Sequence, residues 1–108
     1  MNSAERRAAR WYRLRGWRIL GANVWAAGNE VDFIARRGRS LRFVEVKEKR
    51  GAAFGDPAEM VGPEKQRRVR RAAETWLAAR PDLDGLDIGF DVVGVWEGKL
   101  QRVADAFE

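Results

Sequence analysis

Apolar residues recur with helical spacing in two stretches of the chain. They are Ala8, Trp11, Tyr12 and Leu14 in the first, and Val69, Ala72, Ala73, Trp76 and Leu77 in the second. Intervals of three and four residues place such positions on one face of a helix. The pattern predicts a first helix from Ser3 to Arg15, with Ser3 as its N-cap, and a second from Pro63 to the residue before Pro81.

Five other stretches have the composition of strands. They are Trp17–Trp25, Glu30–Arg36, Leu41–Lys47, Ile88–Trp96 and a short edge strand, Lys99–Val103. Gly21 predicts a bend or bulge in the first of them, and the second and third read as a hairpin. Residues 48–62 lack periodicity and predict a flexible loop. We therefore expect one α/β domain over residues 1–108, with a mixed five-stranded sheet flanked by two helices in the order α-β-β-β-α-β-β.

Composition excludes several kinds of catalysis. The chain has no Cys and no His, so thiolate nucleophiles, imidazole bases and Ser-His-Asp triads are absent. Catalysis would have to use carboxylates, Lys, Arg and a metal. The net charge is +5, and its basic excess lies in the first half of the chain, which suits a polyanionic partner such as nucleic acid or an anionic membrane surface, or else a solvated surface that keeps the protein in solution. No apolar stretch approaches the roughly 20 residues of a membrane span, so a soluble cytoplasmic protein without a membrane partner is expected.

Acidic residues in the hairpin form the most informative group. Alternation places Glu30 and Asp32 on one face of their strand, and Glu45 and Lys47 on one face of the next. Neighbouring strands lie about 4.8 Å apart, so Asp32 and Glu45 can hold one divalent cation such as Mg²⁺ between them, completed by the Val46 carbonyl. Lys47 would hold or deprotonate an attacking water. Alternating charged and apolar residues are also ordinary for a strand with one face in water.

Six motifs in a fixed order carry a resemblance to a known family. They are NEVDFIA (29–35), FVEVK (43–47), FGDPAEMV (54–61) followed by Lys65, WL (76–77), FDVV (90–93) and AF (106–107). The chain resembles the YraN-like family of small bacterial proteins. That resemblance implies the restriction-endonuclease-like fold of the PD-(D/E)XK nuclease superfamily, similar to archaeal Holliday-junction resolvases.

The resemblance also implies roles for individual residues. Asp32 and Glu45 look like metal-binding acids, and Lys47 like the catalytic lysine. Glu5 resembles an acid that binds a second metal or a metal-bound water, although it can equally complement the N-terminus of its helix. Glu30 would orient a water or an Arg, or would simply be exposed to solvent. Resolvase-like relatives imply a homodimer.

Basic and aromatic residues suggest how DNA would be held. The candidates for backbone contacts are Arg6, Arg7, Arg10, Arg13, Lys49, Arg50, Lys65, Arg67, Arg68 and Arg71. Such contacts bind phosphates without reading sequence. Trp25 belongs to the core or stacks on an unpaired base.

The residues and the resemblance together predict a Mg²⁺- or Mn²⁺-dependent DNA endonuclease or endonuclease-like protein, with branched DNA as a candidate substrate. One alternative is a nucleic-acid-binding module on a nuclease scaffold without turnover. Another is an interaction domain that meets an unknown protein partner through its acidic C-terminal part, which includes Asp82, Asp84 and Asp87.

Overall fold

The computed structural model describes residues 1–49 and 56–108, whose main elements follow the predicted order. The helices are α1 (Ser3–Arg13) and α2 (Pro63–Ala78), and the short 3-10 helices η1 (Pro57–Met60) and η2 (Pro81–Leu83) flank α2. The strands are β1 (Arg18–Ala26), β2 (Asn29–Arg37), β3 (Ser40–Glu48), β4 (Asp87–Trp96) and β5 (Lys99–Phe107). The predicted α/β class is therefore confirmed.

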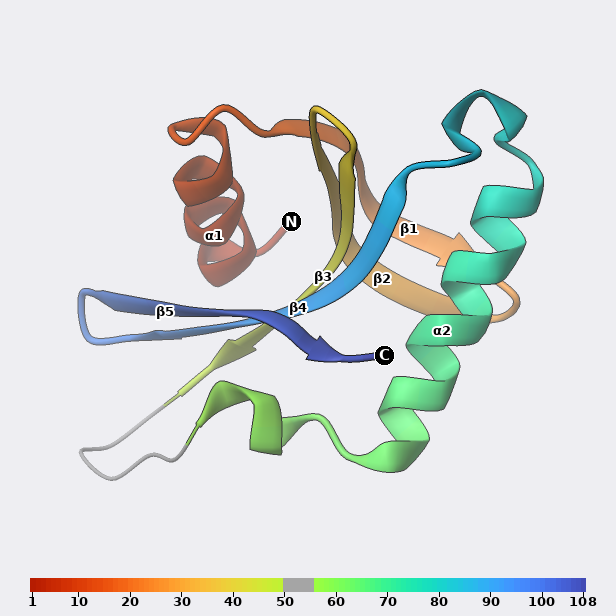
Figure 1. Cartoon of the computed structure of the whole chain (residues 1–108). Helices are drawn as coiled ribbons and strands as arrows, with labels where there is room; N and C mark the ends of the chain where they lie inside the picture. Colours follow the sequence, from red (N-terminus) through yellow and green to blue (C-terminus); the bar gives the residue numbers. More distant parts are fainter. Residues whose placement is uncertain (50–55) are drawn as a thin grey trace.

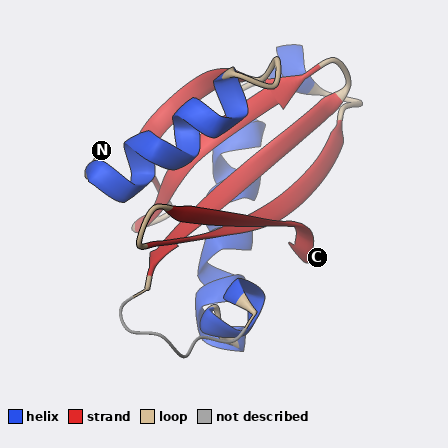
Figure 2. Cartoon of the chain, turned by 90° about the vertical axis from the view of Figure 1, so that its left-hand side faces the viewer, coloured by secondary structure: helices blue, strands red, loops and turns tan. Residues whose placement is uncertain are grey.

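The five strands form one mixed sheet in the order β1-β2-β3-β4-β5. β3 and β4 are parallel and are connected through α2, whereas the other neighbouring pairs are antiparallel. Helix α1 covers one face of the sheet and α2 covers the other (Figures 1 and 2). This layering leaves the ends of the strands free to present side chains beyond the two helices.

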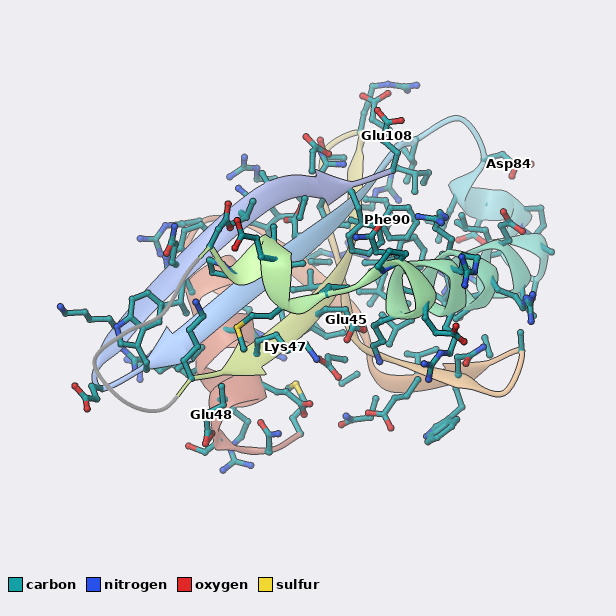
Figure 3. All side chains as sticks on the ribbon, turned by 90° about the horizontal axis from the view of Figure 1, so that it is seen from below. Glu45, Lys47, Glu48, Asp84, Phe90 and Glu108 are labelled. Atoms are coloured by element: carbon teal, nitrogen blue, oxygen red, sulfur yellow. The ribbon has the colours of Figure 1, made fainter. Side chains whose placement is uncertain are left out.

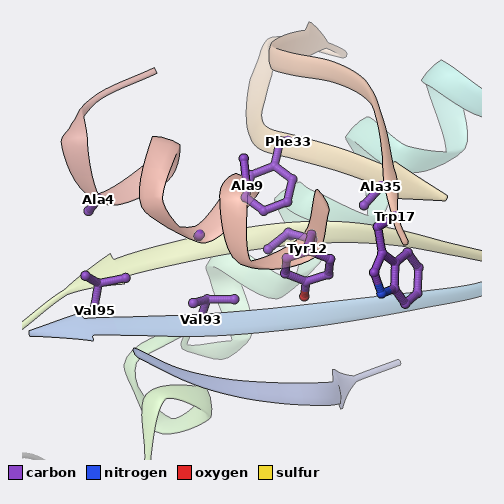
Figure 4. Packing of buried hydrophobic residues seen from close by; sticks show 10 residues of the cluster. Ala4, Ala9, Tyr12, Trp17, Phe33, Ala35, Val93 and Val95 are labelled. Atoms are coloured by element: carbon purple, nitrogen blue, oxygen red, sulfur yellow. The ribbon is translucent and has the colours of Figure 1, made fainter. Parts of the chain in front are cut away.

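Each face of the sheet has its own apolar core. On the α1 face, Tyr12 packs edge-on against Phe33 with ring centroids 5.3 Å apart, and Val93 lies in the same cluster (Figure 4). On the α2 face, Val69 and Phe43 are buried together, as the helical spacing predicted. The packing fixes both helices on the sheet and so determines where their first turns lie.

A buried polar network crosses the α1 face. The Tyr12 hydroxyl donates to Asp91 Oδ2 at 2.6 Å, Arg102 Nη2 lies 2.9 Å from the same oxygen, and the Asp105 N–H donates to Oδ1 at 3.1 Å. Burial, followed by the Asp91 charge, raises the pKa of Tyr12 far above its ordinary value, so the phenol stays protonated as a donor. The network ties α1, β4 and β5 together through one fully buried carboxylate.

The N-terminal helix differs from its prediction in its cap, its end and one apolar position. Asn2, not Ser3, caps α1, because Asn2 and Glu5 form a reciprocal capping box. The helix ends at Arg13 instead of Arg15. Leu14, which was predicted on the apolar face, is 72% exposed because it follows the last helical turn.

The C-terminal strand and the predicted loop also differ from expectation. β5 continues to Phe107 instead of ending at Val103, because its pairing with β4 resumes after a register shift between Phe90 and Val92. Within the predicted loop 48–62, residues 57–60 form η1, which Asp56 caps and whose Pro57 is buried. Residues 50–55 lie outside the described part of the chain. The predicted bulge at Gly21 is confirmed by a register shift between Ile19 and Gly21.

No helix within residues 1–49 and 56–108 is both long enough and apolar enough to span a membrane.

Candidate functional site

Three carboxylates meet at one end of the sheet. Glu30 and Asp32 come from the start of β2, and Glu5 comes from the first turn of α1. One oxygen from each lies within 4.8 Å of the other two. The sequence placed Glu30 and Asp32 on one face by alternation, and the packing of α1 brings Glu5 to them. We call Glu5, Glu30 and Asp32 the carboxylate cluster.

Asn23 of β1 holds two members of the carboxylate cluster together. Its side-chain amide donates to Glu30 Oε1 at 2.9 Å and to Glu5 Oε1 at 3.3 Å. The backbone of Asn23 has φ +49°, a left-handed conformation that Asn tolerates better than most residues. Sequence reasoning missed Asn23, and an Asn inside an apolar strand was the available signal. The Asn2 N–H also donates to Glu5 Oε1 at 3.0 Å, so Glu5 both caps α1 and joins the carboxylate cluster.

Asp32 lies where β2 and β3 separate. The last paired residues of these strands are Phe33 and Val44, and Asp32 Oδ2 then accepts a hydrogen bond from the Val46 N–H at 2.7 Å. Burial, the Glu45 charge and the Glu5 charge, in that order of size, raise the pKa of Asp32 to about 7, whereas the Val46 N–H lowers it. The side chain carries both the repulsion of its acidic neighbours and the cost of desolvation.

Glu45 is the most deeply buried acid of this region. It is 2% exposed, and its Oε2 lies 3.5 Å from Lys65 Nζ at the start of α2. Burial raises the pKa of Glu45, while the charges of Lys65 and Lys47 act in the opposite direction. Among the described residues, Oε1 of Glu45 has no hydrogen-bond partner. Figure 3 shows Glu45 and Lys47 on β3, beside the segment that leads from η1 into α2.

This donor set fits an oxygen-ligated divalent cation. A buried carboxylate oxygen without a donor is costly, and Glu45 presents one next to Asp32, whose own ionisation its neighbours oppose. Two oxygens on opposite sides of Mg²⁺ lie about 4.2 Å apart, and oxygens of Glu5, Glu30 and Asp32 lie within 4.8 Å of one another, so these three carboxylates are close enough to share one ion. Mg²⁺ and Mn²⁺ prefer carboxylate, carbonyl and water oxygens. For Val46, the structure shows the N–H bond to Asp32, and the metal role of its carbonyl stays a prediction.

The predicted DNA-contacting arginines of α1 are largely free to meet a ligand. Arg6, Arg10 and Arg13 are exposed, and Arg7 is half-buried. Arg6 Nη1 donates to the Met1 carbonyl at 2.6 Å, which uses only part of its guanidinium. These side chains remain able to contact a phosphate backbone.

The predicted DNA-contacting residues of α2 and those at the end of β3 differ in exposure and in their partners within the protein. Arg71 is exposed, whereas Arg67 and Arg68 lie 3.3 and 3.8 Å from Glu64 carboxylate oxygens. Lys49 is 6% exposed, with Nζ 5.6 Å from the centre of the Trp96 ring, so the structure does not present it as a surface cation. Arg50 lies outside the described residues.

The fold and the site together define a small α/β protein. Its carboxylate cluster lies where strands β2 and β3 stop pairing. Residues 4–95 match the model of a family described as "Uncharacterised protein family UPF0102". Over 104 residues the chain is 38% identical to a UPF0102 protein of Klebsiella pneumoniae subsp. pneumoniae, covering 95% of this chain and 81% of that protein. It is also 38% identical to the UPF0102 protein YraN of Escherichia coli K12, covering 95% of this chain and 79% of YraN. The chain belongs to the UPF0102 (YraN) family, which confirms the YraN-like resemblance of its motifs.

Proposed function

We propose that this protein is a Mg²⁺- or Mn²⁺-dependent DNA endonuclease of the restriction-endonuclease-like type. The observation that carries the proposal is the position of Asp32, which has an oxygen within 4.8 Å of carboxylate oxygens of Glu5 and Glu30 and lies close enough to the buried Glu45 for that charge to raise its pKa. A divalent cation would stabilise carboxylates that lie this close together, because it offsets their mutual repulsion. The same cation could contact the phosphates that the basic surface attracts.

Each residue of the site has a distinct task in this proposal. Asp32 and Glu45, with the Val46 carbonyl, would hold the ion, and Glu5 would support a second ion or a bound water. When bound, a divalent cation supplies a Lewis acid that polarises the phosphodiester and lowers the pKa of water. Lys47 Nζ would hold the attacking water in line with the leaving oxygen, and the proton that this water loses would pass to solvent. Glu30 accepts from the Asn23 amide, which also donates to Glu5 and so keeps Glu5 in position.

DNA contacts in this proposal are made mainly to the backbone. The exposed arginines of α1, together with Arg71, would bind phosphates, which gives strong salt dependence and little sequence preference. Selectivity would then come from the shape of the DNA, including branches. A homodimer would present two such sites and cut two strands symmetrically, and sedimentation with and without DNA measures that state.

Cleavage of a branched DNA with Mn²⁺ tests the endonuclease proposal. Asp32→Asn and Lys47→Met should each lower the cleavage rate by at least about 100-fold, since each removes a group that acts in the transition state. With Ca²⁺ in place of Mn²⁺, Lys47→Met should retain most of its DNA affinity, and Asp32→Asn should lose only the part that the bound cation contributes. Asp84→Asn, which changes an exposed acid near η2, is the matched control and should cut at the wild-type rate. Unchanged cleavage by Asp32→Asn would show that the nuclease activity lies elsewhere.

A DNA-binding module without turnover is the second candidate. The observation in its favour is the ion pair of Lys65 with Glu45, which balances part of the acidic charge without any cation. It predicts that Asp32→Asn and Glu45→Gln bind DNA at least as tightly as wild type, because both remove repulsion of phosphates. It further predicts that none of these proteins cuts DNA with Mg²⁺ or Mn²⁺, whereas the endonuclease proposal requires wild type to do so.

A further inference from the structure

Trp25 is the aromatic residue whose position the fold does not explain. It is 68% exposed, which excludes the core position that the sequence left open. The other four tryptophans each contact a ring or a cation within the described residues: Trp11, Trp17, Trp76 and Trp96. Within residues 1–49 and 56–108, the indole of Trp25 has no such contact. Leaving a large apolar surface in water has a cost, so a ligand that covers it would gain.

The sheet register places Trp25 beside the carboxylate cluster. Trp25 and Glu30 are direct partners across β1 and β2, and directly opposite residues project from the same face of a sheet. Two residues earlier on the same strand, Asn23 donates to Glu30 and Glu5. These hydrogen bonds tie β1 to the carboxylate cluster, so the backbone that carries Trp25 is anchored next to it.

We propose that Trp25 is a stacking platform for an unpaired base next to the phosphate that binds at the carboxylate cluster. This inference rests on the proposed function and specifies its substrate as DNA with unpaired nucleotides at the site. A base inside a duplex is already stacked on both faces and offers no free face to an indole. An unpaired base exposes its π-face, and stacking on an aromatic side chain accepts any of the four bases. An exposed indole beside a phosphate-binding site therefore favours single-stranded or branched DNA over continuous duplex.

Affinity for two oligonucleotides tests the platform. One is a duplex with a single-stranded flap and the other is the fully paired duplex, and both are measured with Ca²⁺ in place of Mg²⁺. Trp25→Ala should lower affinity for the flap DNA by roughly 5- to 150-fold, the range of one base–aromatic stack, and affinity for the duplex by less than about twofold. Trp25→Phe should keep most of the flap affinity. Leu14→Ala is the control. Leu14 is about as exposed as Trp25 but lies at the C-terminal end of α1, whereas Glu5 of the carboxylate cluster lies in its first turn, so this variant should change neither affinity.

A fluorescent base gives a direct signature of stacking. With 2-aminopurine at successive flap positions, wild type and Trp25→Phe should quench the base at one position, and Trp25→Ala should not. Equal affinity of Trp25→Ala and wild type for both DNAs, or an equal loss on both, would overturn the platform. Cleavage is scored separately with Mn²⁺. If wild type quenches the base but cuts no DNA, only the endonuclease proposal is contradicted. If wild type cuts DNA and Trp25→Ala keeps full flap affinity, only the stacking platform is overturned.

Discussion

Replacing Asp32 with Asn should stabilise the protein at alkaline pH in the absence of divalent cations. The folded protein raises the pKa of Asp32 from 3.8 to about 7, chiefly through burial and the Glu45 charge. Below pH 3.8 the carboxyl is protonated in both the folded and the unfolded chain, so it does not lower the free energy of unfolding. As the pH rises toward 7, the unfolded chain releases this proton first, so stability falls across that interval and the loss is complete above pH 7.

The size of the effect follows from the pKa difference. About three pKa units at 1.36 kcal/mol each give an upper value of about 4 kcal/mol, and solvent reaching the half-buried carboxyl reduces this to roughly 2 kcal/mol. Asn removes the charge and keeps an oxygen for the Val46 N–H. For a domain of this size, roughly 2 kcal/mol corresponds to a rise in Tm on the order of 10 °C.

Thermal unfolding in EDTA, followed by circular dichroism at pH 8 and pH 4, measures this prediction. Asp32→Asn should melt well above wild type at pH 8 and close to it at pH 4. Asp84→Asn, an exposed acid, should change Tm little at either pH. Mn²⁺ at pH 8 should raise the Tm of wild type and leave that of Asp32→Asn almost unchanged. The electrostatic reasoning would be refuted if Asp32→Asn were no more stable than wild type at pH 8. It would also be refuted if the variant raised Tm by the same amount at pH 4 as at pH 8.

Two further substitutions test contacts around the site and in the core. Asn23→Ala removes the amide between Glu30 and Glu5. We expect it to weaken Mn²⁺ binding at least several-fold in calorimetry, whereas an unchanged Kd would show that the carboxylate cluster does not depend on β1. Tyr12→Phe removes one donor to the buried Asp91 and should lower the free energy of unfolding in urea by roughly 1–3 kcal/mol, with no change in metal affinity. A loss of metal binding in Tyr12→Phe would instead couple the Asp91 network to the site.

Local pattern was enough to predict the elements and the nearness of Asp32 to Glu45. Periods of two and about 3.6 residues identified the strands and helices, and the hairpin register placed Asp32 next to Glu45. The same local signals misplaced the helix cap and the end of β5, because Asn2 and Ser3 are both good caps and because pairing with β4, not composition, extends β5.

The remaining part of the site depends on contacts between distant segments. Glu5 reaches Asp32 only because α1 packs on the sheet, and no spacing within the sequence encodes that approach. Asn23 acts through a left-handed backbone and a side-chain amide, which an apolar strand pattern conceals. The pairing of Lys65 with Glu45 likewise follows from the crossover through α2, which brings the start of that helix to the end of β3.

Calorimetric titration of Mn²⁺ into wild type and Asp32→Asn, each with and without an uncleavable phosphorothioate branched DNA, is the most direct test of the central claim. The account predicts that wild type binds Mn²⁺, that DNA tightens this binding, and that Asp32→Asn loses it in both states. Equal Mn²⁺ binding by the two proteins, or no binding by wild type even with DNA bound, would contradict a metal-dependent nuclease site built on Asp32.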